Sequence, residues 1–191
     1  MALRVVSPPA IEPITVSDAK LHSRVDTSLE DDILELWIES ARAFAESYQN
    51  RAYITQTLQL TMDAFPPGSV IQLPRPPLQS VTSVTYYDED DTPDTLDAGD
   101  YIVDEVTQPG MIVLRANKSW PDATLRAKNG IVIEYIAGYG DDAADVPSQV
   151  RDALLLYVTT RYEHRELAHD DMISMGHFLS LLRPHRVVPV R

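Results

Sequence analysis

The sequence predicts an α+β protein, in which a helical bundle carries an inserted antiparallel β subdomain and ends in an extended C-terminal arm. Three observations predict this arrangement. Apolar residues recur at three- and four-residue steps between residues 29 and 50, which is the spacing of an amphipathic helix. Alternating and β-branched segments, typical of strands, occur between residues 55 and 136. Helical spacing returns after Pro147. The bundle should therefore contain a short N-terminal helix, a long second helix and a long C-terminal helix.

Two helices are predicted before residue 53. The first covers residues 14–25, and Thr15 or Ser17 can cap it. The second covers residues 29–50, because a Thr-x-x-Glu capping pattern precedes a long apolar stripe. The pattern consists of Thr27 and Glu30, and the stripe of Leu29, Ile33, Leu36, Trp37, Ala41, Phe44 and Tyr48.

The strands of the β subdomain are separated by turn signals rich in Pro and Gly. Residues 55–62 alternate polar and apolar side chains, as a half-buried strand does. Residues 78–87 are rich in β-branched and aromatic side chains. The predicted antiparallel set is residues 55–62, 70–73, 78–87, 101–104, 111–114 and 131–136.

The C-terminal helix starts at Pro147 and has apolar residues at helical spacing. It must pair with the long second helix, because neither apolar stripe could be buried otherwise. The predicted segments are N-terminal helices in residues 1–52, the β insert in residues 53–140, the C-terminal helix in residues 141–170, and a docking arm in residues 171–191.

Composition narrows the possible functions. The net charge of −13 repels nucleic acid, so direct DNA binding is not expected. The chain has no cysteine, which excludes disulfides, thiolate metal sites and Cys nucleophiles. No secretory signal is visible, and the apolar runs are too short to span a bilayer. We expect a soluble product that is found in the cytoplasm.

The C-terminal arm differs in charge from the rest of the chain. Residues 172–191 contain three arginines and no acid, so the residues before them sum to −16. Pro184 and Pro189 favour an extended chain. We expect a mobile arm that becomes ordered when it docks, and that can be deleted without unfolding the protein. Its apolar cluster consists of Phe178, Leu179, Leu181 and Leu182.

An acidic stretch is the first candidate for chemistry. A calcium loop in an EF-hand register from Asp88 fails, because Pro93 occupies the turn-glycine position and Gly99 the position of the bidentate Glu. A looser calcium site or a solvated hairpin tip remain, and we favour the hairpin tip. The carboxylates are Asp88, Glu89, Asp90, Asp91, Asp94, Asp97, Asp100, Asp104 and Glu105.

No other residues form a catalytic or metal-binding pattern. His164 and His169 are five residues apart, which does not place them on one helix face, and no His-Glu-x-x-His motif occurs. The nucleophile elbow, the P-loop and the dinucleotide-binding glycine motif are all absent. We therefore expect no enzyme activity, no cofactor and no metal.

The order of elements and a series of short motifs resemble the head–tail connector (adaptor) proteins of tailed bacteriophages, in the larger form that carries a β insert. His185 departs from the family pattern, which has an aromatic residue there. The motifs that carry the resemblance are residues 15–26, 31–33, 41–42, 50–57, 73–81, 84–88, 120–121, 135–140, 146–147, 162–166 and 181–186.

This resemblance implies a non-enzymatic homo-oligomeric ring, commonly of twelve subunits, in the virion neck. Such a ring assembles in the host cytoplasm, attaches below the portal protein, joins it to the next neck or tail protein, and extends the DNA channel without binding DNA specifically. The alternatives are another neck or tail-completion ring, or a metal-dependent binding module that uses residues 88–104. The predicted portal or subunit interface is Phe178, Leu179, Leu181, Leu182, Arg183, Pro184 and Arg186.

Overall fold

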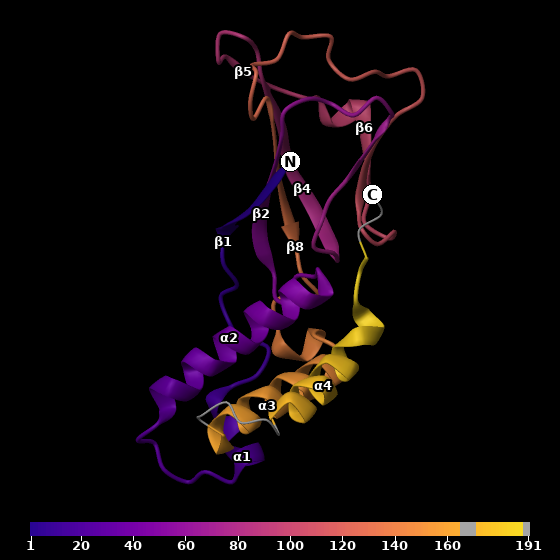
Figure 1. The fold of residues 1–191 in the computed structure, drawn as a ribbon. Coiled ribbons are helices and arrows are strands. Elements are labelled where there is room, and N and C mark those ends of the chain that lie inside the picture. Colours follow the sequence, from indigo (N-terminus) through magenta and orange to yellow (C-terminus); the bar gives the residue numbers. More distant parts are fainter. Residues whose placement is uncertain (165–170, 189–191) are drawn as a thin grey trace. The chain divides into compact units, whose positions relative to one another are not determined.

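The computed structural model describes residues 1–164 and 171–188, and the side chains of all of these except residues 171–175. Within this part, four helices and two antiparallel sheets confirm the predicted α+β class (Figure 1). No helix among the described residues is long and apolar enough to cross a membrane. The strands and helices are β1 (Ala2–Ser7), α1 (Val16–Ser23), α2 (Asp31–Gln49), β2 (Gln56–Met62), β3 (Val70–Gln72), β4 (Leu78–Tyr87), β5 (Pro93–Thr95), β6 (Tyr101–Asp104), β7 (Met111–Leu114), β8 (Ile131–Ala137), α3 (Ser148–Glu163) and α4 (Asp171–Leu182).

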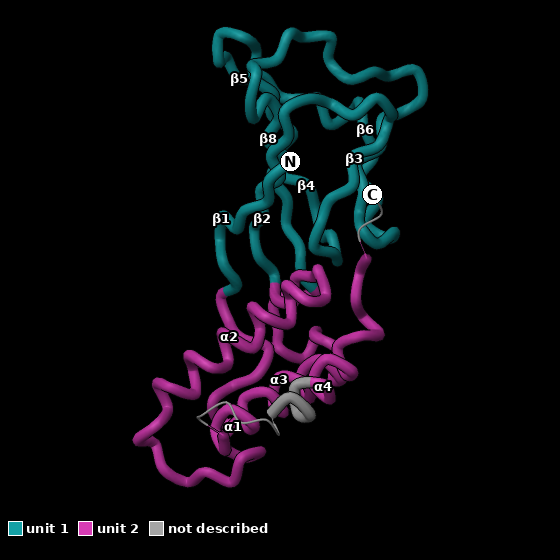
Figure 2. Tube along the Cα trace, in the orientation of Figure 1, with its two compact units in different colours: residues 1–9, 55–138 teal, residues 10–54, 139–191 magenta. Residues whose placement is uncertain are grey.

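The chain folds into two compact units (Figure 2). Residues 1–9 and 55–138 form the β unit, and residues 10–54 and 139–191 form the helical unit. Residues 1–9 were expected within the N-terminal helical segment 1–52, but β1 pairs with β2 and so lies in the β unit. The sequence carries little signal for β1, because all six of its side chains are exposed and none is selected for burial.

The β unit contains both sheets, in the strand orders β1-β2-β8-β4-β5 and β3-β7-β6. Every second residue of β2 and β8 is buried, and the register places Leu58 opposite Tyr135 and Leu60 opposite Ile133. One face of the central strands is therefore the core of this unit, as the alternating pattern predicted. The Tyr135 hydroxyl donates to the Pro74 carbonyl oxygen at 2.7 Å, and burial raises the pKa of Tyr135.

Gly110 lies where the chain passes close to β4. A Cβ atom there would lie 2.5 Å from Cβ of the buried Leu78. We expect Gly110→Ala to lower the free energy of unfolding of the β unit by about 1–3 kcal/mol, the usual cost of overpacking. Urea denaturation followed by Trp120 fluorescence measures this loss. Gly68→Ala is the control, because nothing lies within 4 Å of a Cβ at that position. Equal losses in both variants would contradict the overpacking argument.

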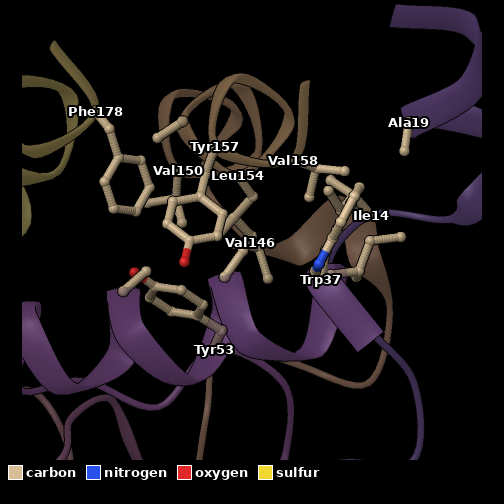
Figure 3. Close-up of a cluster of buried hydrophobic side chains, with 14 of the residues drawn as sticks. Ile14, Ala19, Trp37, Tyr53, Val146, Val150, Leu154, Tyr157, Val158 and Phe178 are labelled. Carbon is tan, nitrogen blue, oxygen red and sulfur yellow. The ribbon is translucent and has the colours of Figure 1, made fainter. Parts of the chain in front are cut away.

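The helical unit has one hydrophobic core, to which all four helices contribute (Figure 3). The long helices α2 and α3 bury their apolar faces in the same cluster, as the sequence predicted. The α2 side chains in it are Leu34, Trp37, Ile38, Ala41 and Ala45, and those of α3 are Val150, Ala153, Leu154, Tyr157 and Val158.

The helix starts differ from the predicted ones. The predicted capping box of Thr27 and Glu30 is wrong, because α2 begins at Asp31 with Glu30 as its N-cap, and Glu30 is therefore not the third helical residue that a box from Thr27 requires. A capping box begins α1 instead, where Thr15 Oγ1 accepts from the Asp18 N–H and the Asp18 carboxylate accepts from the Thr15 N–H. The hydrogen bonds from Thr15 hold the pKa of Asp18 below its ordinary value.

The apolar stripe of α2 also differs from the predicted one. Leu29 precedes the helix and is 91% exposed, and Leu36 is 57% exposed. Leu34 and Ile38, which were not assigned to the stripe, are fully or almost fully buried. Apolar residues lie on more than half of the circumference of α2. Helical spacing alone therefore could not show which side of this helix is buried. Leu36 therefore lies on the surface of the helical unit.

Candidate docking interface

The candidate interface is the C-terminal segment, which we define as residues 176–188. The prediction of an extended arm over residues 171–191 requires correction, since α4 continues to Leu182 and a 3-10 turn, Arg183–His185, follows it. Extended backbone begins at Arg186. Pro184 is compatible with this course because it lies at the start of the turn, where a missing N–H costs little. Residues 189–191 lie outside the described part.

Two of the predicted interface residues belong to the core of their own chain. Phe178 and Leu182 are 1% and 0% exposed. The Phe178 ring lies beside the Tyr157 ring (Figure 3), at 5.2 Å between centroids. The centroid of the Phe44 ring is 5.7 Å from that of Phe178. Phe178 and Leu182 are four residues apart on a helix and so share its inner face. They are not available to bury against a portal or a neighbouring subunit, which corrects that expectation.

Polar side chains at the end of α2 also fix the C-terminal segment. Gln49 Nε2 donates to the Leu182 carbonyl oxygen at 2.5 Å, and the Tyr53 hydroxyl donates to Gln49 Oε1 at 2.6 Å. Arg51 Nε donates to the His185 carbonyl oxygen at 2.5 Å. The Val187 N–H donates to the Gln49 carbonyl oxygen at 2.8 Å. The segment therefore leaves the helical unit along a defined path up to Val187.

These contacts were missed by sequence reasoning, and the reason is physical. Gln49 and Arg51 donate to backbone carbonyls, so no particular side chain in the C-terminal segment is needed to receive them. Gln49 is fully buried and Arg51 is 9% exposed. One sequence signal could have indicated these contacts. Gln49 lies on the core side at the end of the apolar stripe of α2, and a buried polar side chain requires a hydrogen-bond partner.

A buried ion-pair cluster supports the same end of α2. Arg42 Nε lies 2.6 Å from Glu12 Oε2, and Arg42 Nη1 lies 3.2 Å from Glu46 Oε2. Glu46 Oε1 also accepts from the Tyr53 N–H at 2.8 Å. Burial lowers the pKa of Arg42, but the hydrogen bonds and charges of Glu12 and Glu46 outweigh burial and raise the pKa above its ordinary value. The cluster ties together three parts of the chain, at residues 12, 42–46 and 53.

The remaining predicted interface residues face outward to different degrees. Arg183, Pro184 and Arg186 are exposed, whereas Leu179 and Leu181 are half-buried against the core. The Arg186 guanidinium lies 4.9 Å from the centroid of the Tyr48 ring, which is within the range of a cation–π interaction. The outer surface of the C-terminal segment is therefore basic, and no carboxylate occurs between residues 176 and 188. Such a surface can bind carboxylates of another protein.

The acidic stretch uses its carboxylates in local turns. Asp88 Oδ1 accepts from the N–H groups of Asp90 and Thr92, and Asp104 Oδ1 accepts from two N–H groups of the following turn. The Tyr86 hydroxyl donates to Asp94 at 2.6 Å, which lowers the pKa of Asp94. Among the described residues, no group of three or more His, Asp and Glu side chains could hold a metal ion. Residues 88–92 form the tip of the β4–β5 hairpin, and residues 89–92 are exposed, as expected for a solvated tip; the later carboxylates lie in β5, in β6 and in the turns beside these strands.

The histidines have ordinary polar neighbours. His22 Nδ1 lies 2.7 Å from Thr159 Oγ1, and His185 Nε2 lies 3.2 Å from Gln149 Oε1. His164 and His177 are exposed, and His169 lies outside the described residues. The contact between His185 and Gln149 is a further tie between the C-terminal segment and α3.

Residues 13–96 match the model of a protein family described as "Phage gp6-like head-tail connector protein". This match confirms the predicted resemblance to head–tail connectors, a family of structural proteins rather than enzymes. No curated protein matches the chain.

Solved structures share the fold over the whole chain. A chain from the neck of an empty gene transfer agent (GTA) particle, computed with C6 symmetry, is 21% identical with a TM-score of 0.85. A chain from the virion of the native GTA particle is 21% identical with a TM-score of 0.80. A chain from the neck of the native particle, computed with C12 symmetry, is 20% identical with a TM-score of 0.79. In each case the similarity covers 100% of this chain and 98% of the other.

Proposed function

We propose that this chain, a head–tail connector by the family that its residues 13–96 match, forms a homo-oligomeric ring in the neck of a phage-like particle. The observation that carries the proposal is this family match. The likeness of the complete fold to chains from GTA necks supports it. Those necks were computed with C6 and C12 symmetry, so a ring of twelve subunits is the arrangement we propose here.

The portal protein is the partner that we propose for the exposed end of the C-terminal segment. Pro184, Arg186 and Val188 are exposed and follow the last helix, so they are the part of the segment that is free to contact another protein. Arg186 can pair with carboxylates of the portal. Arg51 and Gln49 hold the preceding backbone, which reduces the entropy that this contact must overcome.

Passage of DNA through the ring fits the charge of the chain. Twelve copies at −13 each carry −156 before screening. Over a Debye length of about 8 Å, carboxylates that face the channel would repel the DNA backbone. We propose that DNA slides through the ring without specific binding, and that the opposite side of the ring joins the next neck or tail protein.

Deletion of residues 184–191 tests the proposed portal contact. The truncated chain keeps Phe178 and Leu182 in its core, so we expect it to remain folded. It should lose portal attachment by about tenfold or more, since it loses the exposed basic contact and its repetition around the ring. Cosedimentation with portal particles measures attachment, and far-UV circular dichroism measures folding.

Arg115→Glu is the matched control, because it changes an exposed arginine of the β unit. Normal attachment of the truncated chain would contradict the proposed portal contact. Loss of attachment in the Arg115→Glu variant alone would place the contact on the β unit instead.

A further inference from the structure

We infer that two faces of the helical unit form the contact between neighbouring copies in the ring. One face is the outer flank of α2, and the other is the exposed side of α4 with the 3-10 turn that follows it. The inference rests on the proposed ring and goes beyond it by naming the two surfaces that meet.

The outer flank of α2 is acidic and has an apolar centre. Asp32, Glu35 and Glu39 are exposed, and at about 100° per residue they lie on one flank together with Leu36. Among the described residues, none of the three carboxylates takes part in an ion pair. Leu36 is 57% exposed, at a position where a polar side chain would be equally compatible with the helix. This flank has the composition of a surface that a partner covers.

The exposed side of α4 has the opposite character. Gly176, His177, Ser180 and Arg183 are exposed. Helical spacing of about 100° per residue places Gly176, Ser180 and Arg183 opposite the buried Phe178, with His177 beside them. Nothing lies within 4 Å of a Cβ atom built at Gly176, and Ser180 is one turn further along. Gly176 and Ser180 therefore leave room on this face for the Leu36 side chain of a second copy, and Arg183 lies one turn beyond Ser180. Among the side chains that the structure describes in α4 and the 3-10 turn, none is a carboxylate.

The two faces lie on different sides of the helical unit. On α2, the flank opposite the carboxylates carries Phe44, whose ring is 5.7 Å from the ring of Phe178 on α4. The α2 carboxylates therefore point away from α4, and the exposed side of α4 points away from α2. A closed ring requires two different faces of this kind, because each subunit contacts its two neighbours through different surfaces.

Charge decides which faces can meet. Contact between the α2 flanks of two copies would bring six unpaired carboxylates together, which is unfavourable. Contact between the α2 flank and the side of α4 brings Arg183 to an acidic surface, and no carboxylate occurs between residues 176 and 188. Like-charge repulsion and opposite-charge attraction both select the head-to-tail contact. A second copy of this chain is therefore the partner that fits the α2 flank.

The absence of cysteine from the chain permits a direct test. A Leu36→Cys variant and a Ser180→Cys variant, with tags of different mass, are mixed under mild oxidation at micromolar concentration. We expect a disulfide-linked pair of unlike chains, at least about tenfold above the control, because a bound contact holds the two thiols at millimolar effective concentration. The control is the Ser180→Cys variant mixed with a Glu89→Cys variant, which changes an exposed residue at the hairpin tip of the β unit.

A like pair of Leu36→Cys chains as the main product, or cross-linking no greater than in the control, would overturn the inference. The double variant Glu35→Arg/Glu39→Arg provides a second measurement, with an expected loss of self-association of about tenfold or more. Adding Arg183→Glu should restore part of this loss. Normal association of the double variant would also overturn the inference.

Portal attachment separates this inference from the proposed function. Subunits that form a collar on the portal without the predicted cross-link would overturn only the interface. Subunits that give the cross-link but do not bind the portal would support the interface and contradict the portal role.

Discussion

Replacing Phe178 with alanine is expected to lower the free energy of unfolding of the helical unit by about 3–5 kcal/mol, the usual cost of removing a buried aromatic ring. Phe178 is 1% exposed, and its ring contacts Phe44 and Tyr157. The cavity would lie between α2, α3 and α4, whose side chains cannot all move to fill it. This is the largest stability effect that we predict for a single residue of the C-terminal segment.

Fluorescence can follow this unit separately, because the two tryptophans lie in different units. Trp37 belongs to the core of the helical unit and Trp120 to the β unit. In a Trp120→Phe background, urea denaturation followed by fluorescence reports on the helical unit. Leu29→Ala is the matched control, since Leu29 is 91% exposed and its loss should cost no more than about 0.5 kcal/mol. Equal midpoints for Phe178→Ala and Leu29→Ala would contradict the assignment of Phe178 to the core.

This result would also contradict the expectation that the C-terminal arm can be deleted without unfolding the protein. Deletion of residues 172–191 was expected from the sequence to leave a folded protein. The deletion removes Phe178 and Leu182 from the core, so we now expect it to destabilise the helical unit. The part that can be removed begins after the 3-10 residue Arg183, beyond the buried anchors. Loss of portal attachment after the longer deletion could therefore result from unfolding of the helical unit rather than from loss of the docking contact.

Replacing Arg42 with methionine is the second change with a large expected effect, a loss of about 3–5 kcal/mol in the free energy of unfolding. The side chain of Arg42 is within 3.2 Å of Glu46, which is 3% exposed. Methionine keeps much of the apolar volume but leaves the buried Glu46 carboxylate without this cation. The same denaturation experiment at neutral pH measures the loss.

Glu12→Gln is the matched control for Arg42→Met. The Glu12 side chain is 29% exposed, so water can replace part of its contact with Arg42, and the loss should be about 1 kcal/mol. A loss in the Glu12→Gln variant as large as that in Arg42→Met would show that the contact to Glu12, rather than the buried contact to Glu46, stabilises the end of α2.

Local sequence signals predicted three strands at their observed bounds. The predicted ranges 78–87, 101–104 and 111–114 coincide with β4, β6 and β7, because runs of β-branched and aromatic residues end at turn residues. The strand β1 was missed, since its side chains are all exposed and its pairing with β2 depends on residues at least fifty positions away. Pairing over such a distance leaves no local pattern.

The candidate site was predictable only in part. The exposed basic residues Arg183 and Arg186 could be identified from charge, because the surrounding segment contains no acid. Helical spacing of Phe178 and Leu182 was present in the sequence, but nearby prolines favoured an extended chain. Whether these residues bury in their own chain or in a partner depends on tertiary contacts, including the hydrogen bond from Gln49 to a backbone carbonyl.

The most direct test of the connector role is to image this chain mixed with the portal protein that we propose as its partner. Negative-stain or cryogenic electron microscopy of the mixture, with mass by light scattering, shows whether subunits attach as a ring. We predict a collar with cyclic symmetry on one end of each portal, continuing its channel. A chain that remains a monomer and leaves the portal unchanged would contradict the proposed function.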